Sequence, residues 1–287
     1  MRRPPEIAVE ENTMRTIVGL TSAFEGLASM RIMQSKSKVA QAKKYYDDLW
    51  QIYSQIRVSS MFQFGRSEYE EPLNKELYIL ITAPGGLMGD IDQRLIRLMK
   101  ETYDKEKHDI IVIGRHGALQ LGQSEIPYKA YYKLPDGDTI NVDPLMREVR
   151  KYHNATVFYQ TYVSLTKQEV KSIDLNTIIK SRSAPIKEGS EVITEGTYIF
   201  EPSTYAVVAH FERSMVRMMI SELIFDSRLA QFASRFRAMG AAKDRSVEET
   251  NNLHIEFNRA KRGIVDQRLK EITAGLKKLK RERAESS

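Results

Sequence analysis

Residues 203–283 read STYAVVAHFERSMVRMMISELIFDSRLAQFASRFRAMGAAKDRSVEETNNLHIEFNRAKRGIVDQRLKEITAGLKKLKRER, without a single proline. When heptads are written with position a at Val208, fourteen of the twenty a and d positions are apolar. An apolar seam of this period predicts a continuous helix that pairs with another helix. The seam then slips by one residue, as expected for a helix of roughly 3.6 residues per turn. Its slipped positions are Val265, Leu269, Ile272, Leu276 and Leu279.

Such a helix is too long to fold inside a globule. Roughly eighty residues at ~1.5 Å each make a rod of about 120 Å. A compact chain of 287 residues has a radius of gyration of only ~19 Å. The helix must therefore project, and we expect a second helix along it.

The N-terminal region offers that second helix, between about Asn12 and Val58. A first a/d run and, after a skip of one residue, a second run keep the helical period. Small residues near the start would allow close approach of an antiparallel partner. The first run is Ile17, Leu20, Phe24 and Leu27; the second is Ile32, Val39, Ala42, Tyr46, Leu49, Tyr53 and Ile56; the small residues are Gly19, Ala23, Gly26, Ala28 and Ser29.

The middle of the chain has the pattern of an α/β unit. Leu77–Thr82 and Ile110–Gly114 are apolar runs typical of strands buried on both faces, and Gly89–Lys105 has the spacing of an amphipathic helix. Strand, helix and strand at this distance imply a parallel pair with a right-handed crossover. We also predict a helix at Pro144–His153 and a strand at Thr156–Leu165 that continues near Val170–Ile173.

We therefore predict an α/β fold combined with a long antiparallel coiled coil of the two terminal helices. The middle would be a Rossmann-like α/β domain. The predicted segments are an N-terminal shaft helix at 1–60, an α/β foot domain at 73–180, a linker at 181–202 and a C-terminal shaft helix at 203–287.

The composition excludes several classes of protein. Without cysteine the chain can form no disulfide, thiolate zinc site or cysteine nucleophile, and we expect a reducing compartment. The longest apolar stretches, such as Leu77–Ile81, are far shorter than the ~20 residues of a membrane-spanning helix. Met1–Glu11 contains two Arg, two Pro and three Glu, so we expect neither a signal peptide nor a transit peptide.

Positive charge is concentrated near the C-terminus. The chain carries 44 Lys and Arg against 38 Asp and Glu, a formal charge of +6. Residues 259–283 contain ten basic and three acidic side chains, or +7, which leaves −1 for the remainder. A nucleic-acid-binding arm would have few apolar residues, whereas an apolar seam runs through this segment. The pattern favours a shaft in a protein socket over a nucleic-acid arm.

No motif supports catalysis or cofactor binding. Thr82–Asp90 lies where an α/β fold places a phosphate loop, but it lacks the Lys-Ser/Thr pair of a Walker motif and the dinucleotide spacing. We predict a structural turn there, with Asp90 starting the next helix, and another turn at Gly114–Gly117. No two of the five histidines have metal-ligand spacing on one helix face. Adjacent carboxylates such as Asp47 and Asp48 lie on exposed-looking segments. We expect no catalytic, metal-binding or cofactor-binding residue.

Several stretches of this chain resemble one family. Arg237–Ala242, Asn251–Leu253 and Phe257–Ile272 are similar to the C-terminal signature of the gamma subunits of F-type ATP synthases, the central rotor shaft. Leu80–Gly89 resembles the family's Ile-Thr-x-x-x-Gly-Leu-Cys-Gly turn, with Met88 at the Cys position. Ile113–Gly117, Phe158–Ser164 and, more weakly, Met30–Arg31 also match, so the resemblance spans nearly the whole chain.

The resemblance implies a shaft of paired helices inside an F1 hexamer of alpha and beta subunits, with the foot near the epsilon subunit and the membrane c-ring. It implies that rotation is coupled to ATP synthesis or hydrolysis and to proton or sodium translocation. The chain would be a non-catalytic subunit with no cofactor, no direct nucleotide and no nucleic acid, peripheral at the cytoplasmic face of the bacterial plasma membrane. Lys261, Arg262 and Asp266 occupy positions whose side chains contact loops of the hexamer, and Asp266 stands where the family usually has Thr.

Two departures from the family keep alternatives open. The Lys-rich start of the N-terminal helix is largely replaced by Gly19–Gly26, and the chain ends in basic Lys277–Arg283 rather than a short apolar tip. The alternatives are a coiled-coil nucleic-acid-binding or scaffold protein, and the rotor of a specialised F1-like ATPase.

Overall fold

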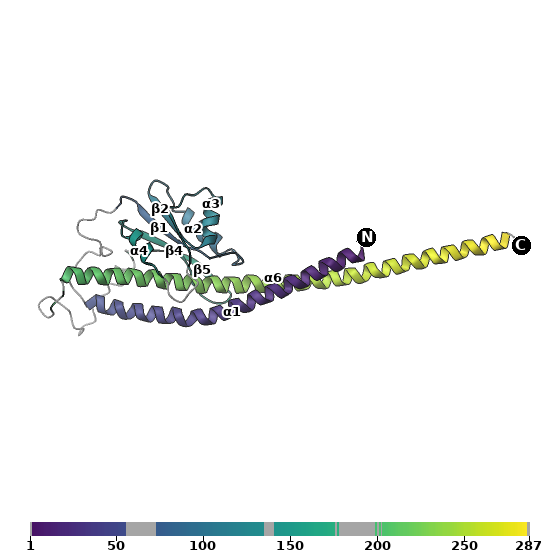
Figure 1. The fold of residues 1–287 in the computed structure, drawn as a ribbon, viewed down its shortest axis with the longest axis horizontal. Helices are drawn as coiled ribbons and strands as arrows, with labels where there is room; N and C mark the ends of the chain where they lie inside the picture. Colours follow the sequence, from purple (N-terminus) through teal and green to yellow (C-terminus); the bar gives the residue numbers. More distant parts are fainter. Residues whose placement is uncertain are drawn as a thin grey trace. The chain divides into compact units, whose positions relative to one another are not determined.

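The computed structural model describes residues 2–55, 73–134, 141–175, 177, 199, 201 and 203–285. Two long helices, α1 (Pro4–Gln55) and α6 (Thr204–Glu285), flank a sheet in sequence (Figure 1). The predicted linker 181–202 lies outside the described residues except for Ile199 and Glu201, as do residues 56–60. The chain divides into two compact units, residues 1–26 with 239–287 and residues 27–238.

The larger unit contains a five-stranded sheet in the order β3-β2-β1-β4-β5. Four strands are parallel, and β5 pairs antiparallel with β4 at one edge. The predicted fold class, long terminal helices around a Rossmann-like α/β middle, is confirmed. The strands are β1 (Glu76–Ile81), β2 (His108–Ile113), β3 (Ala130–Tyr132), β4 (Ala155–Tyr162) and β5 (Gln168–Asp174); the helices between the parallel strands are α2 (Ile91–Lys100), α3 (Arg115–Gln123) and α4 (Asp143–Val149).

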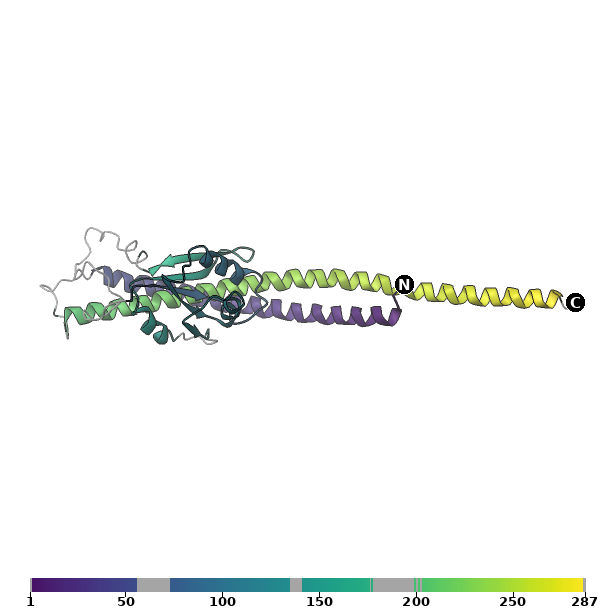
Figure 2. The same cartoon turned by 90° about the horizontal axis from the view of Figure 1, so that it is seen from above.

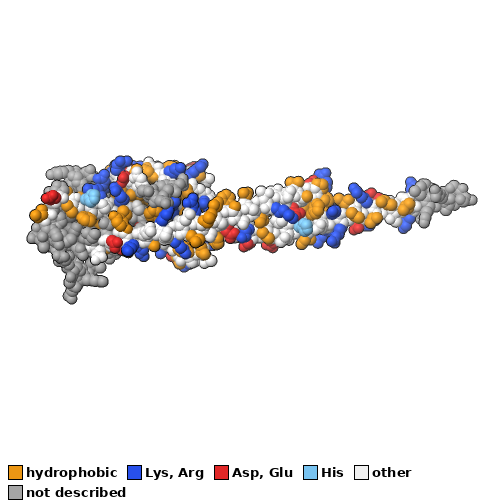
Figure 3. Space-filling model, turned by 60° about the horizontal axis from the view of Figure 1, so that its bottom comes forward, with side chains coloured by type: hydrophobic (Ala, Val, Ile, Leu, Met, Phe, Trp, Pro, Cys, Tyr) orange, Lys and Arg blue, Asp and Glu red, His pale blue; other side chains and the backbone are white. Residues whose placement is uncertain are grey.

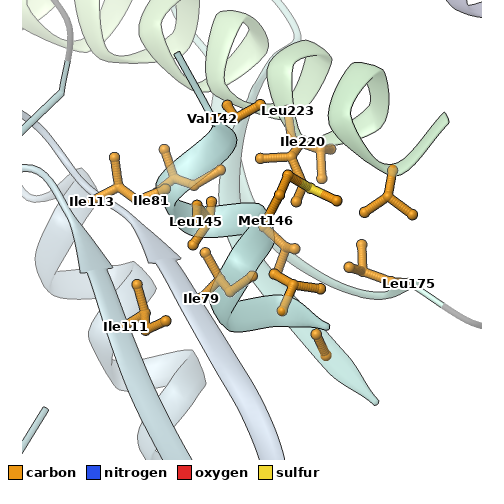
Figure 4. Packing of buried hydrophobic residues seen from close by; sticks show 14 of the residues in the cluster. Ile79, Ile81, Ile111, Ile113, Val142, Leu145, Met146, Leu175, Ile220 and Leu223 are labelled. Carbon is orange, nitrogen blue, oxygen red and sulfur yellow. The ribbon is translucent and has the colours of Figure 1, made fainter. Parts of the chain in front are cut away.

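Both faces of the sheet are covered, which explains the uninterrupted apolar runs of β1 and β2. Leu77, Ile79 and Ile81 pack in a core with α4 and α6, whereas Tyr78 and Leu80 pack with α2 and α3 on the opposite face. Successive side chains of a strand point to opposite faces, so a strand that is buried on both sides needs apolar residues at every position. Figure 4 shows Leu145 and Met146 of α4 in the first core, together with Ile220 and Leu223 of α6.

In the larger unit, α6 buries a wider face than the predicted seam. Val216 and Ile220 pack against the sheet, whereas Leu229 and Ala233 pack with Ile32 of α1. Only Leu229 of these α6 residues is on the predicted a/d seam. A helix that contacts a sheet on one side and a helix on the other must be apolar over more than one narrow seam.

In the smaller unit, the start of α1 pairs with a late part of α6. Ile7 is fully buried in a cluster with Leu253 and Ala260, and Glu25 binds Lys243 with a 2.6 Å ion pair. Low numbers on α1 meet high numbers on α6, so the pair is antiparallel (Figure 1, Figure 2).

The predicted first seam of α1 is wrong in this unit. Leu20 and Phe24 are exposed by 54% and 37%, whereas the polar residues Glu11 and Thr21 are buried. The small Thr21 side chain donates its hydroxyl to the Ile17 carbonyl at 2.8 Å, and Glu11 lies 3.3 Å from His254 of α6. Polar side chains can be buried when they have partners of this kind, whereas a prediction from apolar spacing alone places them on the exposed face.

Three further local predictions differ from the structure. The strand predicted to continue from Thr156–Leu165 is instead a hairpin, in which Tyr162 pairs with Gln168. The turn predicted at Gly114–Gly117 is the start of α3. The helix predicted at Gly89–Lys105 is α2, which ends at Lys100 and is followed by turns, in which Thr102 N donates to the Met99 carbonyl oxygen. The helices α3 and α4, with nine and seven residues, are short enough for local pattern to define them poorly.

Candidate functional site on the C-terminal helix

In the smaller unit, the end of α6 extends beyond its helix partner. α1 begins at Pro4 and buries Ile7 against Ala260, whereas α6 continues to Glu285, 25 residues past Ala260. From Lys261 to Lys278 no described side chain is buried, and only Gly263 is intermediate. This part of α6 is therefore helical and open to a partner along its described length.

One face of this extension carries a row of exposed apolar side chains, which we call the α6 stripe. Its members recur at spacings of four and three residues and therefore share a face of the helix. Figure 3 shows hydrophobic and basic side chains next to one another along this part of α6. Exposed apolar rows of this kind mark protein-interaction surfaces. The stripe consists of Val265, Leu269, Ile272 and Leu276, exposed by 51%, 56%, 60% and 57%.

The three residues predicted to contact a partner, Lys261, Arg262 and Asp266, are all exposed on this extension. Lys261 lies four residues before Val265 and thus on the face of the stripe, whereas Arg262 and Asp266 are four residues apart on the adjacent face. The structure therefore brings all three next to the apolar row. What this surface can do chemically is bind, through apolar contact and charge.

The described residues offer no group of three or more His, Cys, Asp or Glu side chains that could hold a metal ion. Within the same residues, no helix combines the length and apolarity required to cross a bilayer.

A second set of polar side chains, missed by sequence reasoning, is buried in the larger unit. Asp92, at the start of α2, is 1% exposed and accepts a 2.8 Å hydrogen bond from Gln160 Nε2 of β4. Gln231 of α6 in turn donates to Gln160 Oε1 at 3.1 Å. We call these residues, with His116, the Asp92 network.

His116, at the start of α3, completes the network. Its Nδ1 lies 2.7 Å from Asp92 Oδ2, which also accepts a hydrogen bond from Ala83 N at 3.0 Å. The hydrogen bond to Asp92 raises the pKa of His116 above its usual value, against a smaller effect of burial. An imidazole next to a carboxylate is common in active sites, but here the Asp92 carboxylate is 1% exposed, so it is closed to solvent.

The network lies where a doubly wound sheet would bind a ligand, outside the carboxyl ends of β1 and β4. Here α6 occupies that place. Ser227 Oγ accepts a hydrogen bond from Gln160 N at 3.2 Å, and Ser234 Oγ donates to the Met88 carbonyl at 2.6 Å. The sheet is therefore connected to α6 by buried hydrogen bonds as well as by apolar packing.

The Thr82–Asp90 turn also packs on α6. A side chain at Gly89, where φ is +64°, would meet Ser234 Oγ at 3.4 Å. Asp90 is the N-cap residue of α2, as predicted, but its side chain makes no capping hydrogen bond; its Oδ2 lies 3.3 Å from Arg94 Nε. Two residues later, Asp92 Oδ2 accepts a hydrogen bond from Ala83 N. The buried carboxylate of Asp92, and not that of Asp90, therefore orders this turn.

Comparison with known proteins gives one family. The family model described as ATP synthase matches residues 6–279. The ATP synthase gamma chain of Brevibacillus brevis is 24% identical over 270 residues, which cover 89% of this chain and 91% of that protein. The ATP synthase gamma chain of Desulfitobacterium hafniense is 23% identical over 272 residues, with 91% and 94% covered.

Solved structures show a similar fold. A chain of the Euglena gracilis mitochondrial ATP synthase, solved with OSCP, F1 and c-ring, matches with a TM-score of 0.62, 13% identity and 95% of both chains covered. A chain of the Tetrahymena thermophila mitochondrial ATP synthase central stalk and c-ring matches with a TM-score of 0.56, 14% identity, and 78% of this chain and 99% of that chain covered. At these identities the likeness concerns the fold.

Proposed function

The chain belongs to the ATP synthase family as a gamma chain, and on that premise we propose that it is the central-stalk rotor of an F1-type ATP synthase or ATPase. The observation that carries the proposal is the extension of α6 beyond α1, with its exposed α6 stripe. We expect an exposed apolar face of this kind to be buried against a partner. In the proposed complex, that partner is the hexamer of alpha and beta subunits.

The proposed mechanism follows from the asymmetry of the extension. Its surface has an apolar stripe on one face and Lys or Arg side chains beside it, so rotation presents a different face to each catalytic subunit in turn. Contacts that differ between open and closed catalytic sites would bias their equilibrium. Rotation would thereby be coupled to ATP synthesis or hydrolysis, and through the membrane c-ring to proton or sodium translocation.

Lys261, Arg262 and Asp266 are our proposed contacts with loops of the hexamer. Their support is exposure next to the α6 stripe and the family resemblance of Phe257–Ile272. The chain would contribute no catalytic residue and bind no nucleotide. We place it in the peripheral F1 part, at the cytoplasmic face of a bacterial plasma membrane.

The Asp92 network has a proposed part in transmitting torque. It joins the sheet to α6 through groups that are at most 1% exposed, and buried hydrogen bonds give a stiffer connection than surface contacts. The sheet domain would be the foot that meets the c-ring and the epsilon subunit. Rotation of the foot would then turn α6 with little relative movement between the sheet and this helix.

The test is assembly with alpha and beta subunits co-expressed with this chain. We expect the double substitution L269Q/I272Q to weaken co-purification with the hexamer by about tenfold, because both side chains lose apolar contact on binding. L119Q, at a side chain exposed by 53% on α3, is the matched control and should assemble normally.

Charge reversal at the proposed contacts gives a second test. K261E/R262E should weaken the assembly by about tenfold if these side chains contact hexamer loops. Tight binding of the purified chain to DNA at moderate salt, without any association with the hexamer, would overturn the rotor proposal in favour of a nucleic-acid-binding coiled coil.

A further inference from the structure

Two methionines on one turn of α1, Met30 and Met33, are open to solvent in the larger unit. Their exposed fractions are 54% and 74%. The other described methionines are shielded, so an oxidant in solution reaches the thioethers of Met30 and Met33 first. Those of intermediate exposure are Met14 and Met218, and those at most 7% exposed are Met88, Met99, Met146, Met215, Met219 and Met239.

The two side chains belong to the surface of α1 and not to its packed face. Ile32, which lies between them in sequence, is 4% exposed and packs with Leu229 and Ala233 of α6. Because the packed face is formed by other residues, a polar atom added at either methionine sulfur leaves this cluster intact. A modification at Met30 and Met33 therefore changes the surface of the helix while the fold is kept.

The rest of the sequence leaves these thioethers without a competing sulfur group. The chain contains no cysteine, so the thiolates that oxidants attack most readily are missing. The product of methionine oxidation is a sulfoxide, which is polar and accepts hydrogen bonds. Gln34, four residues after Met30, and Lys36, three residues after Met33, carry N–H donors on the next turn of α1.

We propose that Met30 and Met33 form a reversible oxidation site for hydrogen peroxide. A lone pair of the thioether sulfur attacks one peroxide oxygen, and the S–O bond forms as the O–O bond breaks. The departing hydroxide takes the proton from the transferred oxygen and leaves as water. Sulfur loses the two electrons that the peroxide gains. Leu27, which is 51% exposed, and the two methionines follow one another at spacings of three, and oxidation makes two of these three apolar side chains polar.

The experiment treats the purified full chain with hydrogen peroxide and follows each methionine by peptide mass mapping. Trypsin cuts after Arg31, so Met30 and Met33 fall on separate peptides, residues 16–31 and 32–36. We expect both to gain one oxygen at least about tenfold faster than the six buried methionines. In urea, where the fold is lost, the rates should converge. Methionine sulfoxide reductases for the two epimers, with a dithiol as reductant, should remove the oxygen again.

A second readout measures the change in surface polarity. The oxidised chain should elute earlier from a hydrophobic-interaction column and keep its helical circular dichroism. M30L/M33L keeps the apolar surface without the sulfur atoms, so peroxide should leave its retention unchanged. M14L, at a shielded methionine, is the matched control and should show the wild-type shift. Equal oxidation rates for buried and exposed methionines in the folded chain, or unchanged retention after oxidation of Met30 and Met33, would overturn the proposal.

Discussion

Gly114, between β2 and α3, has a backbone φ of +103°, and a Cβ there would lie 2.1 Å from the Thr82 carbonyl oxygen and 2.7 Å from its carbon. Both contacts are to backbone, so relief requires the strand end to move. We expect G114A to lower the free energy of unfolding by about 2–4 kcal/mol, measured by urea denaturation. The control is G86A, where a Cβ meets nothing within 4 Å. Equal stability of the two variants would contradict this prediction.

His116 gives stability a dependence on pH. Its pKa is raised by the hydrogen bond to Asp92, so the charged pair contributes fully below the unfolded pKa of about 6.5 and is lost as pH rises through the folded value. We expect the wild-type chain to lose more unfolding free energy than H116N between pH 6 and 8.5. H210N, at an exposed histidine of α6, should keep the wild-type slope. Parallel profiles for wild type and H116N would exclude this role.

At the scale of elements, we expect the extension of α6 to contribute to assembly with the hexamer and not to the stability of the isolated chain. Residues 277–287 follow the last member of the α6 stripe, and the side chains of Lys277 and Lys278 are exposed. We expect truncation after Leu276 to leave the unfolding midpoint of the isolated chain unchanged and to weaken, without abolishing, association with the hexamer, because the stripe remains. Co-purification and thermal melts measure both effects.

A second truncation supplies the control. Ending the chain after Ala260 removes the stripe while keeping the cluster of Ile7, Leu253 and Ala260. It should therefore abolish most of the association and still fold. Complete loss of hexamer binding already after Leu276 would show that the basic end, and not the stripe, holds the complex together.

The sequence determines some of these elements better than others. The apolar period of α6 and the strands β1 and β2 were predictable, because burial on both sides of a strand or along a long seam imposes a pattern over many residues. The seam of α1 was not, since hydrogen bonds and ion pairs let Glu11 and Thr21 take buried positions while Leu20 stays outside.

The candidate site was also predictable only in part. The residue spacing of the α6 stripe predicts an apolar face, and the position where α1 starts determines that this face is exposed. The Asp92 network does not, because Gln160 is 68 residues from Asp92 and 71 from Gln231 in sequence. Single polar residues at such separations carry no local period, and only the folded sheet brings them together.

At the scale of the whole molecule, α1 and α6 each have residues in both units. The sheet domain that we propose as the foot and the proposed hexamer-binding extension are therefore linked by the continuous helix α6. The natural chain has no cysteine, and K105C would place a single thiol on an exposed turn of the foot. A probe attached to this thiol, in a complex whose hexamer is fixed to a surface, should rotate in one direction when ATP is supplied and stop when ATP is removed. Without the extension, after truncation at Ala260, rotation should become rare or cease, because the hexamer loses its contact with the stripe. Continued ATP hydrolysis by the full complex around a stationary probe would contradict a rotor, since a shaft that transmits torque cannot stay still while the catalytic sites turn over.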